Sequence, residues 1–96
     1  MSEIGSVLDE LFAVIEERKT DAPGGSYTAQ LLTGPLDKLL KKIGEESTEV
    51  VIAAATHDRD QLRYEAGDIV YHLLVVMARE GLTIDDLAAE LSGRRR

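Results

Sequence analysis

Five acidic side chains in two clusters are the residues of this chain whose spacing points to chemistry. Glu45, Glu46 and Glu49 form the first cluster, and Glu65 and Asp68 form the second. Residues three or four apart share one face of a helix, so each cluster gathers its carboxylates on one face. Carboxylate oxygens are the ligands of hard divalent cations. The two clusters therefore predict a magnesium site, provided that the helices carrying them face each other.

The position of these acids relative to the apolar residues separates a metal site from an ordinary solvated surface. With about 100° per residue, Glu46 falls between Leu39 and Val50, in the middle of an apolar stripe. Glu49 falls at the edge of that stripe and Glu45 further out. An isolated E-E-x-x-E motif is more often a solvated helix face, because glutamate is a good helix former. A carboxylate beside a core is costly unless something positive neutralises it, which favours the metal site here.

Helical periodicity recurs along the whole sequence, and no segment alternates with the period of a strand. We expect long helices from about residue 2 or 3 to 19, from Gly34-Pro35 to about 56, and from 60 to 80, with shorter ones at 28–33 and after Thr83 to about 91. Ser26, Asp60 and Thr83 are the expected N-caps, and Gly81 is expected just beyond a helix end. The expected apolar faces are Ile4, Val7, Leu8, Leu11, Phe12 and Ile15 in the first helix, and Leu36, Leu39, Leu40, Ile43, Val50 and Ala54 in the second long helix.

These segments predict an all-α helical bundle formed by a single domain over residues 1–96. A chain of 96 residues has room for one core. The stretch 69–77 is apolar nearly all round, and such a helix must be covered on every side. In so short a chain a second subunit is the obvious cover, so we expect a homodimer.

Composition excludes several classes of function. The net charge of −7 and the pI near 4.7 argue against a nucleic-acid partner, which requires a basic face. There are no cysteines, so disulfides and thiolate metal sites are impossible. No leader-like segment and no apolar run of membrane-spanning length is present, so we expect no membrane partner and a cytoplasmic location.

Several basic and aromatic residues are candidates for contacting a phosphorylated ligand, and each has an ordinary structural alternative. Lys42 lies on the same edge as Glu49, and Lys38 lies one turn earlier, but both also suit a solvated helix face. Tyr27 suits stacking on a base or packing on the first helix. His72 is four residues after Asp68 and suits either a hydrogen bond to it or a place at the edge of the core.

Two runs of this sequence resemble the signature of the phosphoribosyl-ATP pyrophosphatase family. They are Lys42–Ala54, with its E-E-x-x-E motif, and Tyr64–Val75, with its E-x-x-D motif followed by Tyr71-His72. The segment 26–28 (Ser-Tyr-Thr) and the closing segment 85–91 are similar to that family as well. The acids alone indicate only the wider all-α nucleoside triphosphate pyrophosphatase superfamily, which includes MazG-like enzymes and dimeric dUTPases. Gly67 departs from the pattern, which has alanine there.

The resemblance implies the second step of histidine biosynthesis, in its stand-alone form. Phosphoribosyl-ATP would be hydrolysed between its α and β phosphates to phosphoribosyl-AMP and pyrophosphate, with Mg²⁺ as cofactor. The implied metal ligands are Glu46, Glu49, Glu65 and Asp68. Glu45 is an outer ligand, a second-metal ligand or the base that orients water, so the catalytic candidates are Glu45, Glu46 and Glu49. The candidates for contacting the substrate are Lys42, Lys38, Ser26, Tyr27 and Thr28.

Two other functions remain open on the sequence. The first is a housekeeping pyrophosphatase that uses the same acids on non-standard nucleoside triphosphates. The second is a non-catalytic helical dimerisation module whose acids are surface residues.

Overall fold

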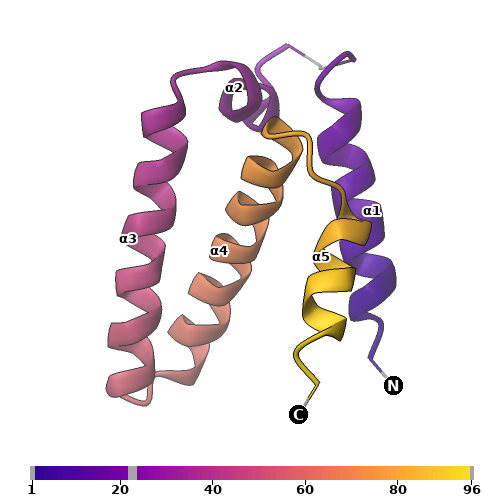
Figure 1. Cartoon of the computed structure of the whole chain (residues 1–96). Helices are drawn as coiled ribbons and strands as arrows, with labels where there is room; N and C mark the ends of the chain where they lie inside the picture. The colour runs from indigo at the N-terminus through magenta and orange to yellow at the C-terminus, as the bar shows by residue number, and fades with distance from the viewer. Residues whose placement is uncertain (1, 22–23, 96) are drawn as a thin grey trace. The chain divides into compact units, whose positions relative to one another are not determined.

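All the regular secondary structure is helical in the part that the computed structural model describes, residues 2–21 and 24–95, and no strand occurs there. The all-α prediction is confirmed. The expected loop at 21–25 includes two residues, 22 and 23, outside the described ranges. Along the chain the helices are α1 (Ile4–Glu17), α2 (Tyr27–Thr33), α3 (Leu36–Ala55), α4 (Arg59–Arg79) and α5 (Ile84–Ser92) (Figure 1).

The helices form two compact units. The first unit consists of residues 1–33 and 74–96, and the second of residues 34–73. Helix α4 contributes to both units, because the boundary falls between Leu73 and Leu74. A single domain over residues 1–96 stays a prediction. No helix within the described ranges is long and apolar enough to cross a membrane.

In the second unit a tight connection joins α3 to α4. His57 adopts a left-handed backbone conformation, with φ of 58°. The amides of His57 and Asp58 donate to the carbonyls of Ala54 and Ala53, at 3.2 and 2.9 Å. These two bonds make a Schellman motif, which ends α3 and leaves only a short link before α4. A link this short makes the two helices antiparallel neighbours, as Figure 1 shows for α3 and the first turns of α4.

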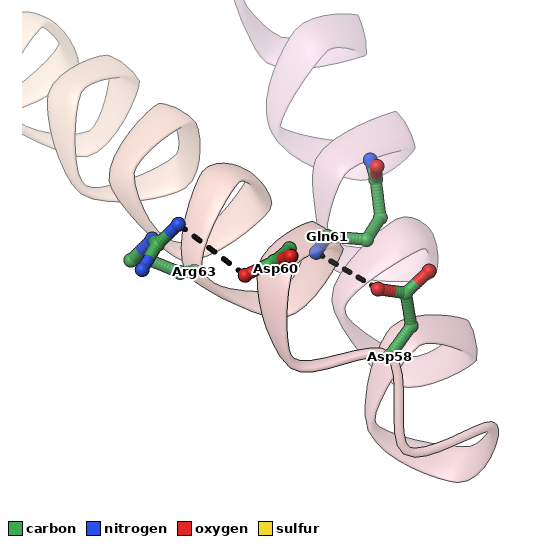
Figure 2. A network of polar contacts seen from close by, with 4 residues as sticks. All are labelled: Asp58, Asp60, Gln61 and Arg63. Atoms are coloured by element: carbon green, nitrogen blue, oxygen red, sulfur yellow. Dashed lines mark hydrogen bonds and ion pairs between the residues drawn. The ribbon is translucent and has the colours of Figure 1, made fainter.

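The N-cap of α4 is Asp58, and the prediction of Asp60 is wrong. The Asp58 carboxylate accepts a hydrogen bond from the Gln61 amide at 3.1 Å, as Figure 2 shows. Since the Schellman motif already ends at Asp58, the new helix begins at the next residue. Asp60 therefore lies in the first turn of α4, where it pairs with Arg63 at 3.4 Å on the exposed surface (Figure 2).

In the first unit α1 lies beside α5, and both ends of the link from α4 to α5 match the sequence prediction. Gly81 has φ of +80°, and the amides of Gly81 and Leu82 donate to Ala78 and Met77 in a second Schellman motif. Thr83 and Asp86 form the predicted capping box at the start of α5.

The expected N-cap of α2 is also confirmed, because the Ser26 hydroxyl accepts a hydrogen bond from the Ala29 amide at 3.2 Å.

The predicted apolar faces are only partly buried. Phe12 and Ile15 of α1 are buried, whereas Ile4 and Val7 are exposed. In α3 the buried residues are Leu39, Glu46 and Ala53, so Ala53 and not the predicted Ala54 lies inside. Exposed apolar side chains remain on both long helices: Leu36, Leu40, Val51, Ile52, Val70 and Leu73.

Arg79, near the end of α4, supplies a hydrogen bond that the backbone of α2 lacks. Within a helix the Leu31 carbonyl would accept from residue 35, but Pro35 has no amide hydrogen. The Arg79 guanidinium donates to the Leu31 carbonyl instead, through Nη1 at 2.9 Å. Pro35, which precedes α3, thus leaves the Leu31 carbonyl at the end of α2 without a backbone donor. The side chain of Arg79, 48 residues further along the chain, donates to that carbonyl.

We expect Arg79→Met to lower the free energy of unfolding by about 1–3 kcal/mol, the cost of leaving a partly buried carbonyl unsatisfied. Arg63→Met removes the same charge from an exposed pair whose contribution is about 0–1 kcal/mol. Urea unfolding of both variants measures the difference. Equal losses would show that the bond to Leu31 contributes nothing of its own.

The capping box makes the stability of α5 depend on pH. The backbone amide of Thr83 donates to the Asp86 carboxylate at 2.8 Å, and the Thr83 hydroxyl donates to the same carboxylate at 3.0 Å. These two bonds hold the pKa of Asp86 below its ordinary value. A carboxyl group whose pKa is lower in the folded state than in the unfolded state stabilises the protein when the pH is above the unfolded-state pKa. This stabilisation is lost as the pH falls through the folded-state pKa.

Asp86→Asn should therefore be less stable than the parent at pH 7, and the gap should close as the pH falls below about 4. Thermal unfolding across this pH range measures the gap. Asp85→Asn, the same charge change one residue earlier, is the control and should show a smaller gap. A gap for Asp86→Asn that does not change with pH would contradict this role of the capping box.

Candidate functional site

A buried carboxylate–imidazole pair joins α3 to α4 in the second unit. Glu46 and His72 are both buried, and Oε1 of Glu46 lies 2.7 Å from Nδ1 of His72. An ionised carboxylate can only accept hydrogen bonds, so Nδ1–H donates. The distance is in the range of a charge-assisted hydrogen bond, which is stronger than one between neutral groups. The acid predicted to lie deepest in the apolar stripe is thus buried and bonded across the helix pair.

The tilt of helical side chains explains why His72 meets Glu46. Glu46 is nine residues before Ala55, the end of α3, and His72 is thirteen residues after Arg59, the start of α4. Counting outward from the turn would place Asp68 opposite Glu46. Side chains lean toward the N-terminus of their own helix, however. On α3 this direction leads away from the link between the helices, and on α4 it leads toward that link. The Glu46 side chain therefore meets a residue about one helical turn beyond Asp68 on α4, which is His72.

Glu65 is the second buried acid, and its partner lies on its own helix. The side-chain amide of Gln61 donates to Oε1 of Glu65 at 2.9 Å. Asp68, one turn further along α4, is half-buried. The predicted E-x-x-D motif therefore places one carboxylate inside and one at the margin.

The remaining predicted residues of α3 are exposed: Lys38, Lys42, Glu45 and Glu49. Within residues 2–21 and 24–95, no three histidine or acidic side chains lie close enough together to hold a metal ion. The structure therefore buries one acid from each cluster and gives each a hydrogen-bond partner, without gathering the predicted ligands around one point.

The predicted substrate segment belongs to the first unit. Ser26 uses its hydroxyl to cap α2, Tyr27 is the first residue of that helix and is about half exposed, and Thr28 is half-buried. The structure thus gives Ser26 a structural role that does not depend on a ligand.

Two partners were not identified from the sequence. The bond from His72 to Glu46 requires the register and tilt of two helices, which the spacing of His72 and Asp68 does not show. Gln61 was missed although it carried a signal, because it is four residues before Glu65 and such pairs meet on a helix surface.

Comparison with known proteins identifies one family over nearly the whole chain. The family model for phosphoribosyl-ATP pyrophosphohydrolase matches residues 8–95. The phosphoribosyl-ATP pyrophosphatase of Haloarcula marismortui is 52% identical over 93 residues, which cover 95% of each chain. That of Limosilactobacillus fermentum is 46% identical over 87 residues, which cover 91% of this chain and 82% of the relative.

Longer relatives carry the same region as one part of a larger protein. The histidine biosynthesis bifunctional protein HisIE of Bacillus subtilis is 44% identical over 88 residues, which are 92% of this chain and 42% of that protein. The matched region includes the helices that bear both acidic clusters in this chain.

Gly67, between the two acids of the E-x-x-D motif in α4, offers a test of local stability beside the site. An added Cβ would meet no atom within 4 Å, and the backbone there does not require glycine. Glycine inside a helix costs about 1 kcal/mol relative to alanine. We expect Gly67→Ala to raise the midpoint of thermal unfolding by about 4–8 °C.

The matched control is Gly81→Ala, because φ of +80° at Gly81 is unfavourable for alanine. This variant should lower the midpoint. Circular dichroism at 222 nm follows both. A lowered midpoint for Gly67→Ala would show that its position is not open.

Proposed function

We propose that this chain, which belongs to the phosphoribosyl-ATP pyrophosphohydrolase family, performs its reaction at the acids on α3 and α4. Membership makes the chain a hydrolase of histidine biosynthesis that releases pyrophosphate from phosphoribosyl-ATP. The observation that supports the position of the site is the buried Glu46 carboxylate bonded across the helix pair. A buried carboxylate is costly to keep for stability alone.

The cleaved bond is the anhydride between the α and β phosphates, and the second product is phosphoribosyl-AMP. This hydrolysis requires neutralisation of charge on the phosphate oxygens and a positioned water molecule. Acidic side chains cannot neutralise phosphates by themselves, so a site rich in carboxylates requires a cation between the two.

Magnesium is the cofactor that the donor set fits, since the predicted ligands offer only hard oxygen atoms. These ligands are Glu46, Glu49, Glu65 and Asp68. Oε1 of Glu46 and Oε1 of Glu65 are engaged by His72 and Gln61, which leaves Oε2 of each acid outside these bonds. When bound, the ion would supply positive charge to the phosphate oxygens and would make a nearby water more acidic.

The other predicted residues act on the water and the phosphates. Glu45 orients the attacking water from its exposed position beside Glu46. Lys42, with Lys38 one turn before it, offsets charge on the pyrophosphate leaving group. The segment of Ser26, Tyr27 and Thr28 contacts the substrate, with Tyr27 against the base or the sugar.

A homodimer is the proposed assembly, in the cytoplasm and without a nucleic-acid partner. Exposed apolar side chains on α3 and α4 support it, among them Val51, Ile52, Val70 and Leu73. Side chains of this kind are covered in stable assemblies. The net charge of −7 is unfavourable for binding a nucleic acid.

Release of pyrophosphate from phosphoribosyl-ATP tests the site directly. We expect Glu46→Gln to lower the rate by about 100-fold or more, since loss of one group that stabilises the transition state has that effect. Glu10→Gln, an exposed acid on α1, is the matched control and should leave the rate unchanged. Full activity of Glu46→Gln, or full activity of the parent without any divalent ion, would refute the proposed metal site.

A substrate panel separates this reaction from that of a housekeeping pyrophosphatase. Phosphoribosyl-ATP is compared with canonical and altered nucleoside triphosphates at equal Mg²⁺. We expect the highest kcat/KM for phosphoribosyl-ATP, together with rescue of a histidine auxotroph that lacks this step. A preference for altered triphosphates would favour the rival function.

A further inference from the structure

We infer that His72 is a positioning residue, which holds the Glu46 carboxylate in the orientation that binds the metal ion. This role rests on the proposed function of Glu46 as a metal ligand. His72 lies on α4, outside the acidic motifs, whereas Glu46 lies on α3. The contact that carries the role is the hydrogen bond that Nδ1 of His72 donates to Oε1 of Glu46.

The hydrogen bond from His72 restricts a side chain that would otherwise be flexible. A glutamate has several rotatable bonds, and fixing them costs conformational entropy. The bond removes much of this freedom before any ligand arrives. The imidazole is itself confined, because it is buried and its ring makes an edge-on contact with Tyr71, with centroids 5.0 Å apart.

Magnesium requires ligands in a narrow range of positions. Mg²⁺ binds oxygen atoms at about 2.0–2.1 Å in a nearly ideal octahedron, so small displacements of a ligand are costly. With Oε1 engaged by His72, Glu46 presents its other oxygen from a defined orientation. Hydrogen bonds to ligating side chains change metal affinity by about 10–100-fold in other proteins.

The second buried acid has the same arrangement. Gln61 donates to one oxygen of Glu65 at 2.9 Å, as His72 does to Glu46 at 2.7 Å. Each buried acid therefore has one oxygen held by a donor from a side chain outside the E-E-x-x-E and E-x-x-D motifs. This repetition is expected if each donor orients its own acid.

Two substitutions of His72 by an amide side chain test whether the hydrogen-bond donor must lie at the position of Nδ1. In His72→Asn the side-chain nitrogen lies close to the place of Nδ1, so the donor to Glu46 is kept. In His72→Gln the nitrogen lies further out, near the place of Nε2, and the short bond is lost. Both residues are neutral and polar, so the pair differs mainly in where the donor lies.

The measurement is the dissociation constant for Mg²⁺ without substrate, by titration calorimetry on the full chain, with the unfolding midpoint recorded for each variant. We expect His72→Asn to bind within about threefold of the parent and His72→Gln about 10–100-fold more weakly. Steady-state kinetics at increasing Mg²⁺ should show the same shift in the Mg²⁺ requirement, with kcat of His72→Gln largely restored at saturating Mg²⁺. Equal binding by the parent and His72→Gln, or equal loss in both variants, would overturn the inference.

Two further observations keep the test decisive. If His72→Gln does not fold, nitrogen NMR of the parent replaces it: Nδ1 of His72 should carry a proton, and its resonance should shift on addition of Mg²⁺. A deprotonated Nδ1, or no shift at saturating Mg²⁺, would overturn the inference. Glu46→Gln distinguishes a failure of the role inferred for His72 from a failure of the proposed metal site. Normal Mg²⁺ binding by Glu46→Gln would refute the metal site itself.

Discussion

The hydrogen bond between Glu46 and His72 connects the stability of this protein to the chemistry proposed for it. Burial of a carboxylate is unfavourable, and a short bond from a buried imidazole offsets part of that cost. The same bond fixes the register of α3 against α4, because it joins one residue in the middle of each helix. Under the proposed function it also leaves the other oxygen of Glu46 for the metal ion. Stability, register and chemistry therefore meet in one contact.

Local backbone features at the helix ends make this contact possible. The left-handed His57 and the cap at Asp58 reverse the chain within a few residues, so that α4 returns along α3. At the start of α3, Pro35 deprives the Leu31 carbonyl of a donor, which Arg79 replaces. In both places one residue ends a helix and also determines how the next one begins.

The sequence predicted the helices well, because capping residues and apolar periodicity are local signals. Ser26, Gly81 and the Thr83–Asp86 box all have their expected roles. Asp60 was a wrong N-cap, since two acids close together at a turn are equally good candidates until the preceding helix end is known. The burial of Glu46 followed from its place on the wheel, but its bond to His72 did not, because register and side-chain tilt belong to the helix pair. The roles of the acids and lysines toward a metal and a substrate stay predictions.

Thermal unfolding of the parent and of Glu46→Gln at increasing Mg²⁺ tests the central claim, that the buried carboxylate is a metal ligand. A ligand that binds only the folded state stabilises it by about 2.7 kcal/mol at one hundred times its dissociation constant. If Glu46 is a ligand, the unfolding midpoint of the parent rises steadily with Mg²⁺ concentration and that of Glu46→Gln does not. Equal rises in both proteins, or no rise in the parent, would contradict the claim.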